Sequence, residues 1–380
     1  MSDDYRKLDF SNFDGKTITK EVVTLKLSDR KEYIINDIII PDSVTSIGDN
    51  AFYNYDRITS LKLPNKLTTI GSEAFYKCTY LESLTIPDSV TSIGVGAFLN
   101  CETLKSLKLS ESLTIIGDST FLNCESLISL TIPNSIKEIS NQAFYNCKNL
   151  TLLKLPDKLT TIGDSAFFNC ESLTSLKLPS TLTTIGDSVF KNCKKLKSLN
   201  IPDSIKTIKY DTFSNCESLT SLELSDKLTT IGNNAFQNCK KLKSLTIPNS
   251  IKVIKQYTFY HCINLTSLTL PDNLTIIGGG AFQNCKKLKS LIIPNSVTTI
   301  GKEAFKNCEK LKSLTLSDKL TTIGDNAFQN CDNLVSFSLP LDKWVLITSN
   351  TKPEWAVAGS RNYVLSNNNL TRTKEFGGHI

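Results

Sequence analysis

Hydrophobic and polar positions along the chain follow a pattern that returns every 23 residues. In the segment SLKLPSTLTTIGDSVFKNCKK, Leu176 and Leu178 alternate with Ser175 and Lys177. This alternation is typical of a β-strand with one buried face. Pro179 ends the strand, because proline has no amide hydrogen to donate to a neighbouring strand.

The second half of the segment predicts a turn and a return. After the proline come two inward-facing positions and a Gly-Asp turn. Phe190, Cys193 and Leu196 then follow at a spacing of three, which suits a short helical or 3₁₀ turn on the outer side. Each coil is therefore predicted to consist of a strand, a turn, an inward arm and a short helical return.

The same pattern covers most of the 380 residues. Each of the twelve cysteines has a phenylalanine three residues before it and a leucine three residues after it. The cysteines are Cys78, Cys101, Cys124, Cys147, Cys170, Cys193, Cys216, Cys239, Cys262, Cys285, Cys308 and Cys331. A period of 23 falls within the range of leucine-rich repeats. The fold class predicted is an α/β repeat solenoid: a curved leucine-rich repeat array with a parallel concave sheet and short helical or 3₁₀ turns on the convex side.

The period also sets the predicted domain boundaries. We expect an N-terminal cap over residues 1–39, thirteen repeats over 40–338, and a C-terminal cap and tail over 339–380. In the N-terminal cap, residues 22–27 imitate the hydrophobic spacing of a strand. Trp344 and Trp355 lie in the tail, where they are expected to cover the last coil or, alternatively, to anchor a partner.

The cysteines are interpreted as structural. A zinc site needs clustered ligands, whereas this chain has one cysteine per coil and two histidines in all. Disulfides between adjacent coils would break the regular repeat into pairs. Free cysteine behaves as a small, buried hydrophobic residue, so the sequence predicts a row of buried free thiols, with no metal and no cofactor.

Strand positions that alternate with the buried leucines must face the concave side. They form an almost unbroken serine row beside nine lysines and two glutamates, a surplus of seven positive charges. The predicted partner-binding residues are Lys62, Lys105, Lys108, Lys154, Lys177, Lys197, Lys243, Lys289 and Lys312. This face is either a solvated surface or a platform for an acidic protein, since a wall of one charge attracts the opposite charge.

A polyanion is an alternative partner, because the sequence KKLK occurs three times, at residues 194–197, 240–243 and 286–289. Nucleic acid is disfavoured. The concave positions contain no aromatic residue for base stacking and no arginine for reading bases.

Two coils, AFYKCTYLESLTIPDSVTSIG and AFFNCESLTSLKLPSTLTTIG, closely resemble the BspA-like leucine-rich repeats. The resemblance covers about residues 35–340. It implies a solenoid used for protein recognition, and members in oral bacteria and parasitic protists are associated with cell surfaces, adhesion and binding to host proteins. A surface adhesin is thus the alternative to an interaction scaffold. An asparagine precedes most cysteines, and we expect it to bond backbone groups from coil to coil.

The remaining sequence features predict neither catalysis nor a membrane span. His261 replaces an asparagine of the repeat, and no group of unique polar residues suggests a catalytic site, so no catalytic residues are predicted. No basic start followed by an apolar run and no stretch of 18 apolar residues occurs. The default expectation is a cytoplasmic protein, with the cell surface, reached by an unconventional route, as the alternative.

Overall fold

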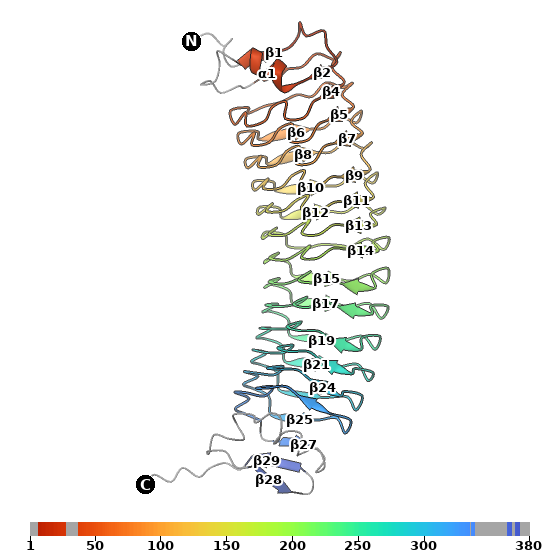
Figure 1. Ribbon diagram of the computed structural model, residues 1–380, viewed down its shortest axis with the longest axis vertical. Helices are drawn as coiled ribbons and strands as arrows, with labels where there is room; N and C mark the ends of the chain where they lie inside the picture. Colours follow the sequence, from red (N-terminus) through yellow and green to blue (C-terminus); the bar gives the residue numbers. More distant parts are fainter. Residues whose placement is uncertain (1–6, 28–36, 335, 339–362, 367–368, 373–380) are drawn as a thin grey trace, which may run out of the picture. The chain divides into compact units, whose positions relative to one another are not determined.

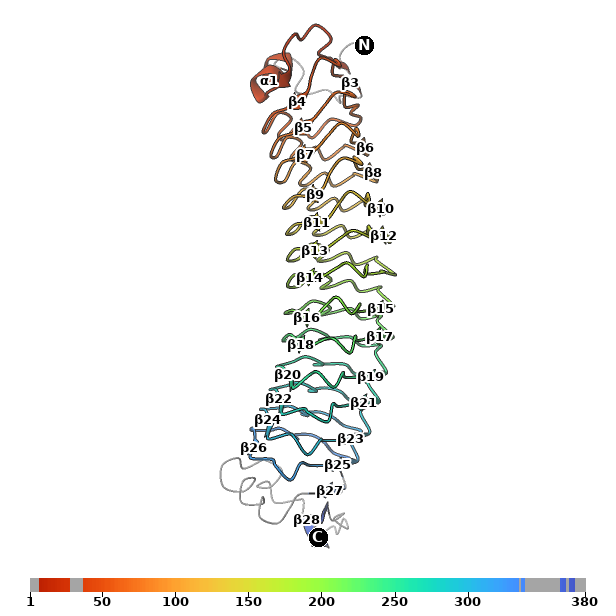
Figure 2. The ribbon, with the colours of Figure 1, turned by 90° about the vertical axis from the view of Figure 1, so that its right-hand side faces the viewer.

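The chain forms a repeat solenoid of parallel strands. The computed structural model describes residues 7–27, 37–334, 336–338, 363–366 and 369–372. These fall in two compact units, Met1–Leu196 and Lys197–Ile380, here called the N-terminal and C-terminal units. Within each unit, successive coils lie one above the next, and their strands form two separate ladders (Figures 1 and 2).

The first ladder consists of strands of three residues, most of them with the pattern Ser-Leu-x, and is here called the Ser-Leu-x ladder. In the N-terminal unit these are β1 (Lys7–Asp9), β3 (Asp37–Ile39), β6 (Ser83–Thr85), β8 (Ser106–Lys108), β10 (Ser129–Thr131) and β12 (Leu152–Lys154). In the C-terminal unit they are β15 (Ser198–Asn200), β17 (Ser221–Glu223), β19 (Ser244–Thr246), β21 (Ser267–Thr269), β23 (Ser290–Ile292), β25 (Ser313–Thr315) and β27 (Ser336–Ser338). The central leucine of β10 is buried and pairs in parallel with the leucine 23 residues later, while its two neighbours are exposed. The predicted strand and its buried face are confirmed.

The second ladder consists of strands of two residues, which the sequence analysis had taken only for an inward arm. In the N-terminal unit these are β2 (Thr17–Ile18), β4 (Ser46–Ile47), β5 (Thr69–Ile70), β7 (Ser92–Ile93), β9 (Ile115–Ile116), β11 (Glu138–Ile139), β13 (Thr161–Ile162) and β14 (Thr184–Ile185). In the C-terminal unit they are β16 (Thr207–Ile208), β18 (Thr230–Ile231), β20 (Val253–Ile254), β22 (Ile276–Ile277), β24 (Thr299–Ile300) and β26 (Thr322–Ile323). Two residues are too few to show an alternation in the sequence, so this ladder could not be recognised there.

Threonine hydroxyls reinforce this second ladder. Thr160 Oγ1 donates to the carbonyl of Lys137 at 3.0 Å, and Thr183 Oγ1 donates to the carbonyl of Thr160 at 3.2 Å. Where a threonine precedes the short strand, as Thr160 and Thr183 do, its hydroxyl bonds the coil that precedes its own. This explains why the sequence repeats Thr-Thr-Ile rather than three apolar residues.

The predicted helical or 3₁₀ return is wrong. From Ser165 to Cys170, successive backbone amides donate in turn to a carbonyl of the next coil and to a carbonyl three residues earlier in their own coil. The amide of Asn169 donates to Lys191 of the next coil at 2.9 Å, whereas that of Cys170 donates back to Phe167 at 3.3 Å. A helix would direct its hydrogen bonds along its own axis and leave none to join the coils. A positive φ at Ser165 (55°) and Asn169 (58°) also excludes helical continuation.

The asparagines before the cysteines form a side-chain ladder, which corrects the expectation that they bond the backbone. Asn146 Nδ2 donates to Asn123 Oδ1 at 2.9 Å, and Asn169 Nδ2 donates to Asn146 Oδ1 at 2.7 Å. Asn192 continues the row at 2.6 Å. Asparagine tolerates a positive φ better than most residues with a side chain, so it can both adopt this backbone conformation and form the amide ladder.

The core of each unit contains a stack of phenylalanine rings. From Phe52 to Phe190, neighbouring ring centroids lie 5.0–5.7 Å apart, with planes within 3–10° of parallel. From Phe213 to Phe328 the separations are 5.3–5.7 Å. Such parallel, offset rings attract one another beyond their burial. From Phe52 onward the coils within each unit thus repeat the same core contact, whereas Phe10 of the first coil meets Phe52 edge-on.

From Glu125 to Lys240, glutamate and lysine alternate at the position after the cysteine. Lys148 pairs with Glu125 at 2.7 Å and Lys194 with Glu171 at 2.9 Å. In the C-terminal unit, Lys240 pairs with Glu217 at 3.0 Å. Each of these partly exposed pairs contributes little, about 0.2–1 kcal/mol. Their value lies in avoiding the like-charge contacts that identical coils would create.

The first coil is longer than the others because it contains a helix, so the 23-residue period of the sequence does not reveal it. Strands β1 and β2 pair in parallel with β3 and β4, so residues 7–18 already form part of a coil. Between β2 and β3 lies helix α1 (Lys20–Leu27), which contradicts the strand-like interpretation of residues 22–27. Its Val23 is buried, and Glu21 lies in the first turn, where the helix dipole favours an acid.

The other end of the array changes strand direction. Strand β29 (Asn369–Arg372) pairs antiparallel with β27 and with β28 (Tyr363–Ser366). This pairing covers an edge of the parallel ladder that would otherwise be open. Trp344 and Trp355 lie outside the described residues, so their capping role stays a prediction.

The ring stack leads to a stability prediction. Phe144 is fully buried, with its ring 5.4 Å from those of both Phe121 and Phe167. We expect Phe144→Ala to lower the free energy of unfolding by about 3–5 kcal/mol, because it leaves a cavity between two rings. Denaturant titration followed by circular dichroism measures this change. Tyr145→Ala is the control: Tyr145 is only half-buried and stacks once, on Phe168, so a loss as large as that of Phe144→Ala would contradict the explanation.

Candidate functional site: the strand face

The exposed side of the Ser-Leu-x ladder, here called the strand face, carries all nine lysines predicted to bind a partner. Each of them is exposed. The N-terminal unit holds Lys62, Lys105, Lys108, Lys154 and Lys177, and the C-terminal unit holds Lys197, Lys243, Lys289 and Lys312. Lys105 pairs with Glu82 at 3.1 Å. Within the described parts of the chain, the other eight have no carboxylate at salt-bridge distance.

Two of these lysines lie side by side in the N-terminal unit. An isolated bridge pairs Leu152 with Ser175 in parallel, so Lys154 and Lys177 occupy equivalent positions in adjacent coils. Parallel strands are about 4.8 Å apart, and like charges directly opposite each other destabilise a sheet. An anion bound between the two ammonium groups would relieve this repulsion.

Apolar side chains also lie on the strand face, and two of them, Ile128 and Leu152, were not recognised from the sequence. Ile128 is 52% exposed and Leu152 is 60% exposed in the N-terminal unit, and Ile292 is 76% exposed in the C-terminal unit. The signal available in the sequence was the break in the serine row at Leu152. Leu152 departs from the repeat, so it is not found by looking for residues that recur every 23 positions.

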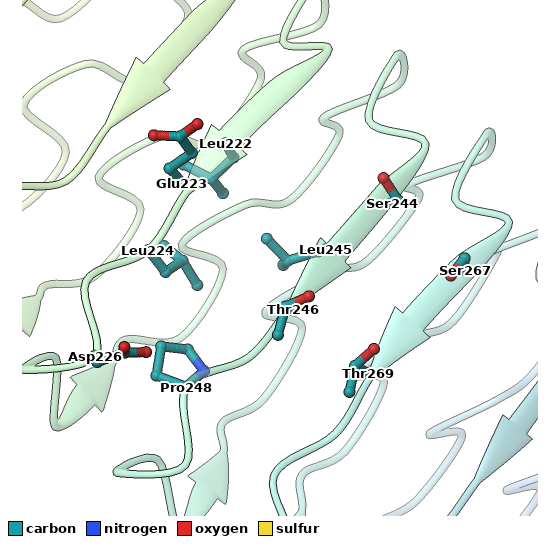
Figure 3. Close-up of a pocket in the computed structure, with 10 residues that line it drawn as sticks. All are labelled: Leu222, Glu223, Leu224, Asp226, Ser244, Leu245, Thr246, Pro248, Ser267 and Thr269. Atoms are coloured by element: carbon teal, nitrogen blue, oxygen red, sulfur yellow. The ribbon is translucent and has the colours of Figure 1, made fainter.

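The C-terminal unit has a shallow pocket of about 350 Å³ on its strand face. Figure 3 shows the hydroxyl side chains of β19 and β21 along one side and two carboxylates, Glu223 and Asp226, on the other. Glu223 belongs to β17, and Asp226 lies in the turn that follows this strand. Asp226 lines the same pocket, so the positive charge of the face is interrupted here.

The cysteines are free and buried, as predicted. Each described thiol contact is to the main chain: Cys124 Sγ donates to the carbonyl of Phe98 at 3.5 Å, and Cys262 Sγ to that of Phe236 at 3.3 Å. Burial raises the pKa of the Cys101, Cys262 and Cys331 thiols to about 12. The reactive thiolate is therefore suppressed at neutral pH.

His261 occupies the asparagine position of its coil, with a positive φ of 61°. Burial lowers the pKa of its imidazole, and Lys240 and Lys286 lower it further. The neighbouring Cys262 thiol is engaged with Phe236 instead. The structure thus does not bring these two residues together for nucleophilic catalysis.

A search for other chemistry covers only the part of the chain that the structure describes. There, no group of three or more His, Cys, Asp or Glu side chains is arranged to hold a metal ion. Likewise, none of the helices within the described ranges has the length and apolar character needed to cross a membrane.

Stacked parallel Ser-Leu-x strands with a buried leucine in each coil define a leucine-rich repeat protein. The chain belongs to the family of the BspA type leucine rich repeat region, which it matches over residues 31–151, 137–266 and 252–350. The expected resemblance is therefore confirmed. Leucine-rich repeat proteins are generally non-enzymatic scaffolds for protein interaction.

Solved structures of bacterial proteins agree with this assignment. A leucine-rich repeat protein from Bacteroides ovatus is 32% identical, with a TM-score of 0.64 over 83% of this chain and 76% of that one. A leucine rich cell surface protein from Faecalibacterium prausnitzii is 27% identical, with a TM-score of 0.51 over 81% of this chain and 86% of that one. The pneumococcal vaccine antigen PcpA, 23% identical with a TM-score of 0.53, covers 85% of this chain and 79% of that one and shares the fold. No curated protein matches the chain.

The buried thiols lead to a labelling prediction. At a pH of about 8, iodoacetamide should leave all twelve cysteines of the native chain unmodified, because burial excludes the reagent and, at Cys101, Cys262 and Cys331, raises the thiol pKa to about 12. In guanidinium chloride all twelve should react, as mass spectrometry would show. A Ser129→Cys variant is the control, since its added thiol lies on the exposed strand face. Rapid labelling of native repeat cysteines would contradict the buried ladder.

Proposed function

We propose that this protein is a non-enzymatic interaction scaffold that binds an acidic protein partner on the strand face. The observation that carries the proposal is the set of nine exposed lysines, eight of which have no described carboxylate partner. Elsewhere on the solenoid, lysines after the cysteines are paired with glutamates of the adjacent coil. The lysines after the cysteines are thus neutralised by glutamates, whereas the lysines of the strand face remain available to a partner.

The hydroxyl row between the lysines supports this proposal. Ser129 and Ser106 are exposed on the strand face and can donate to or accept from a partner at little steric cost. Acidic proteins approach such a surface quickly, because complementary charge steers their encounter. The family to which the chain belongs is one of interaction scaffolds, in agreement with this role.

The lysines of the N-terminal unit provide the test. We expect the joint change of Lys105, Lys108, Lys154 and Lys177 to serine to weaken binding of an acidic dodecapeptide by about tenfold or more, because four favourable charge contacts are lost. Fluorescence anisotropy of a labelled peptide measures the dissociation constant. Circular dichroism verifies that the variant is folded.

A matched control separates the strand face from net charge. Changing the exposed Lys66, Lys77, Lys137 and Lys158 to serine removes the same charge from other faces of the N-terminal unit. Equal weakening in both variants would overturn the strand-face proposal. If heparin binds as tightly as the peptide, and with a steep dependence on salt, the polyanion alternative replaces it.

A second proposal is that the protein is a surface adhesin for host or matrix proteins. It is supported by the likeness to the Faecalibacterium prausnitzii protein, whose description places that protein at the cell surface. Labelling of intact native cells with a membrane-impermeant biotin reagent should then modify this protein but not a cytosolic control. If the protein reacts only after lysis, the adhesin proposal fails and the interior scaffold remains.

A further inference from the structure

Two apolar side chains interrupt the polar rows of the strand face at neighbouring positions. Ile128, 52% exposed, stands where the next two coils have Thr151 and Thr174. Leu152, 60% exposed, stands where the adjacent coils have Ser129 and Ser175. Since the array builds the same fold with threonine and serine at these positions, neither side chain is needed for the core.

Backbone hydrogen bonds place the two residues together. The amide of Ile128 donates to the carbonyl of Lys105 at 3.4 Å, and the amide of Thr151 donates to the carbonyl of Ile128 at 2.8 Å. Leu152 follows Thr151 and pairs with Ser129 in the β10–β12 register. The Cα atoms of Ile128 and Leu152 are thus one diagonal step apart, about 6 Å in parallel sheet geometry.

Lysines surround this pair. Lys105 precedes Ile128 in the same row, and Lys154 follows Leu152 on the same face of β12. Lys177 lies beside Lys154 in the next coil, and Lys108 ends β8. Only Lys105 has a carboxylate partner among the described residues. We call these four lysines together with Ile128 and Leu152 the anchor patch.

We propose that the anchor patch binds a protein segment that carries a bulky apolar side chain flanked by carboxylates. This inference rests on the proposed function and specifies its partner. An apolar centre within a charged rim is the arrangement in which a few central residues dominate affinity, because the rim excludes water around the buried contact. Charge alone would require only the lysines, so the two apolar residues indicate a partner with an apolar anchor.

The alternative, a nucleic acid or another polyanion, fits the patch less well. A phosphate backbone makes no use of exposed aliphatic side chains, and aliphatic residues offer no ring for base stacking. The repulsion between Lys154 and Lys177 is relieved by carboxylates placed beside the apolar anchor. The partner is therefore a peptide segment with both features.

Variants that restore the repeat pattern allow a sharp test. The double change Ile128→Thr and Leu152→Ser introduces the residues that neighbouring coils have at the same positions, so the fold should be retained. The control is Ile115→Thr on β9, which removes a side chain 48% exposed from the other ladder, where β5 and β13 have threonine. The probes are three labelled dodecapeptides: acidic with a central Phe-Leu, acidic with a central Ser-Ser, and Gln-rich with a central Phe-Leu.

The expected result is a pattern over these probes, measured by fluorescence anisotropy. The native chain should bind the acidic Phe-Leu peptide about tenfold more tightly than the acidic Ser-Ser peptide, because burial of an apolar side chain is favourable. It should bind the Gln-rich peptide more weakly than the acidic Phe-Leu peptide. The double variant should bind both acidic peptides alike, while Ile115→Thr should behave as the native chain does.

The contrary outcomes are distinguishable. If the native chain binds both acidic peptides equally, the apolar anchor is overturned while the acidic-partner proposal stands. If neither acidic peptide binds, the proposed function fails and the inference falls with it. If the preference for Phe-Leu persists in the double variant, or is lost in Ile115→Thr, the anchor lies elsewhere and the patch is wrongly assigned.

Discussion

The whole structure depends on the packing of each side chain against its own equivalent 23 residues away. Phe121, Phe144 and Phe167 stack ring on ring, Asn123, Asn146 and Asn169 bond amide to amide, and each buried leucine of β10 and β12 pairs with the next. Only residues that attract copies of themselves can occupy such rows. Aromatic rings, carboxamides and aliphatic chains do so, which accounts for the narrow choice of residues at the buried positions.

Charged residues are the exception, because a row of identical charges repels itself. The array meets this constraint in one row and leaves it unmet in another. After the cysteines, from Glu125 to Lys240, glutamate and lysine alternate, so that Lys148 contacts Glu125 across the coils. On the strand face, Lys154 and Lys177 lie side by side without a described partner. The contrast between the neutralised and the unneutralised rows, rather than the number of lysines, is the reason for proposing the strand face as the binding surface.

Much of the fold could be predicted because its main signals are long and regular. The strand with its buried leucine and the row of buried free thiols follow from a period repeated through the chain. The two-residue second ladder was too short to show a period. The return that contains the phenylalanine and cysteine was predicted as helix because a spacing of three also suits alternating turns with positive φ. Helix α1 was misjudged because its few apolar positions fit either period. The nine lysines are exposed and their role in binding stays a prediction, whereas Ile128 and Leu152 were overlooked because they depart from the residues that recur from coil to coil.

The alternation of Glu125, Lys148, Glu171 and Lys194 has a consequence for how such an array changes in length. Deleting or duplicating one coil would bring two like charges into contact, whereas gaining or losing two adjacent coils preserves every pair. The stretch from Ala235 to Leu245 recurs unchanged 46 residues later, a distance of two coils. A change in length by two coils is therefore compatible with the ion pairs between Glu125 and Lys240, and the recurring stretch has the same two-coil spacing.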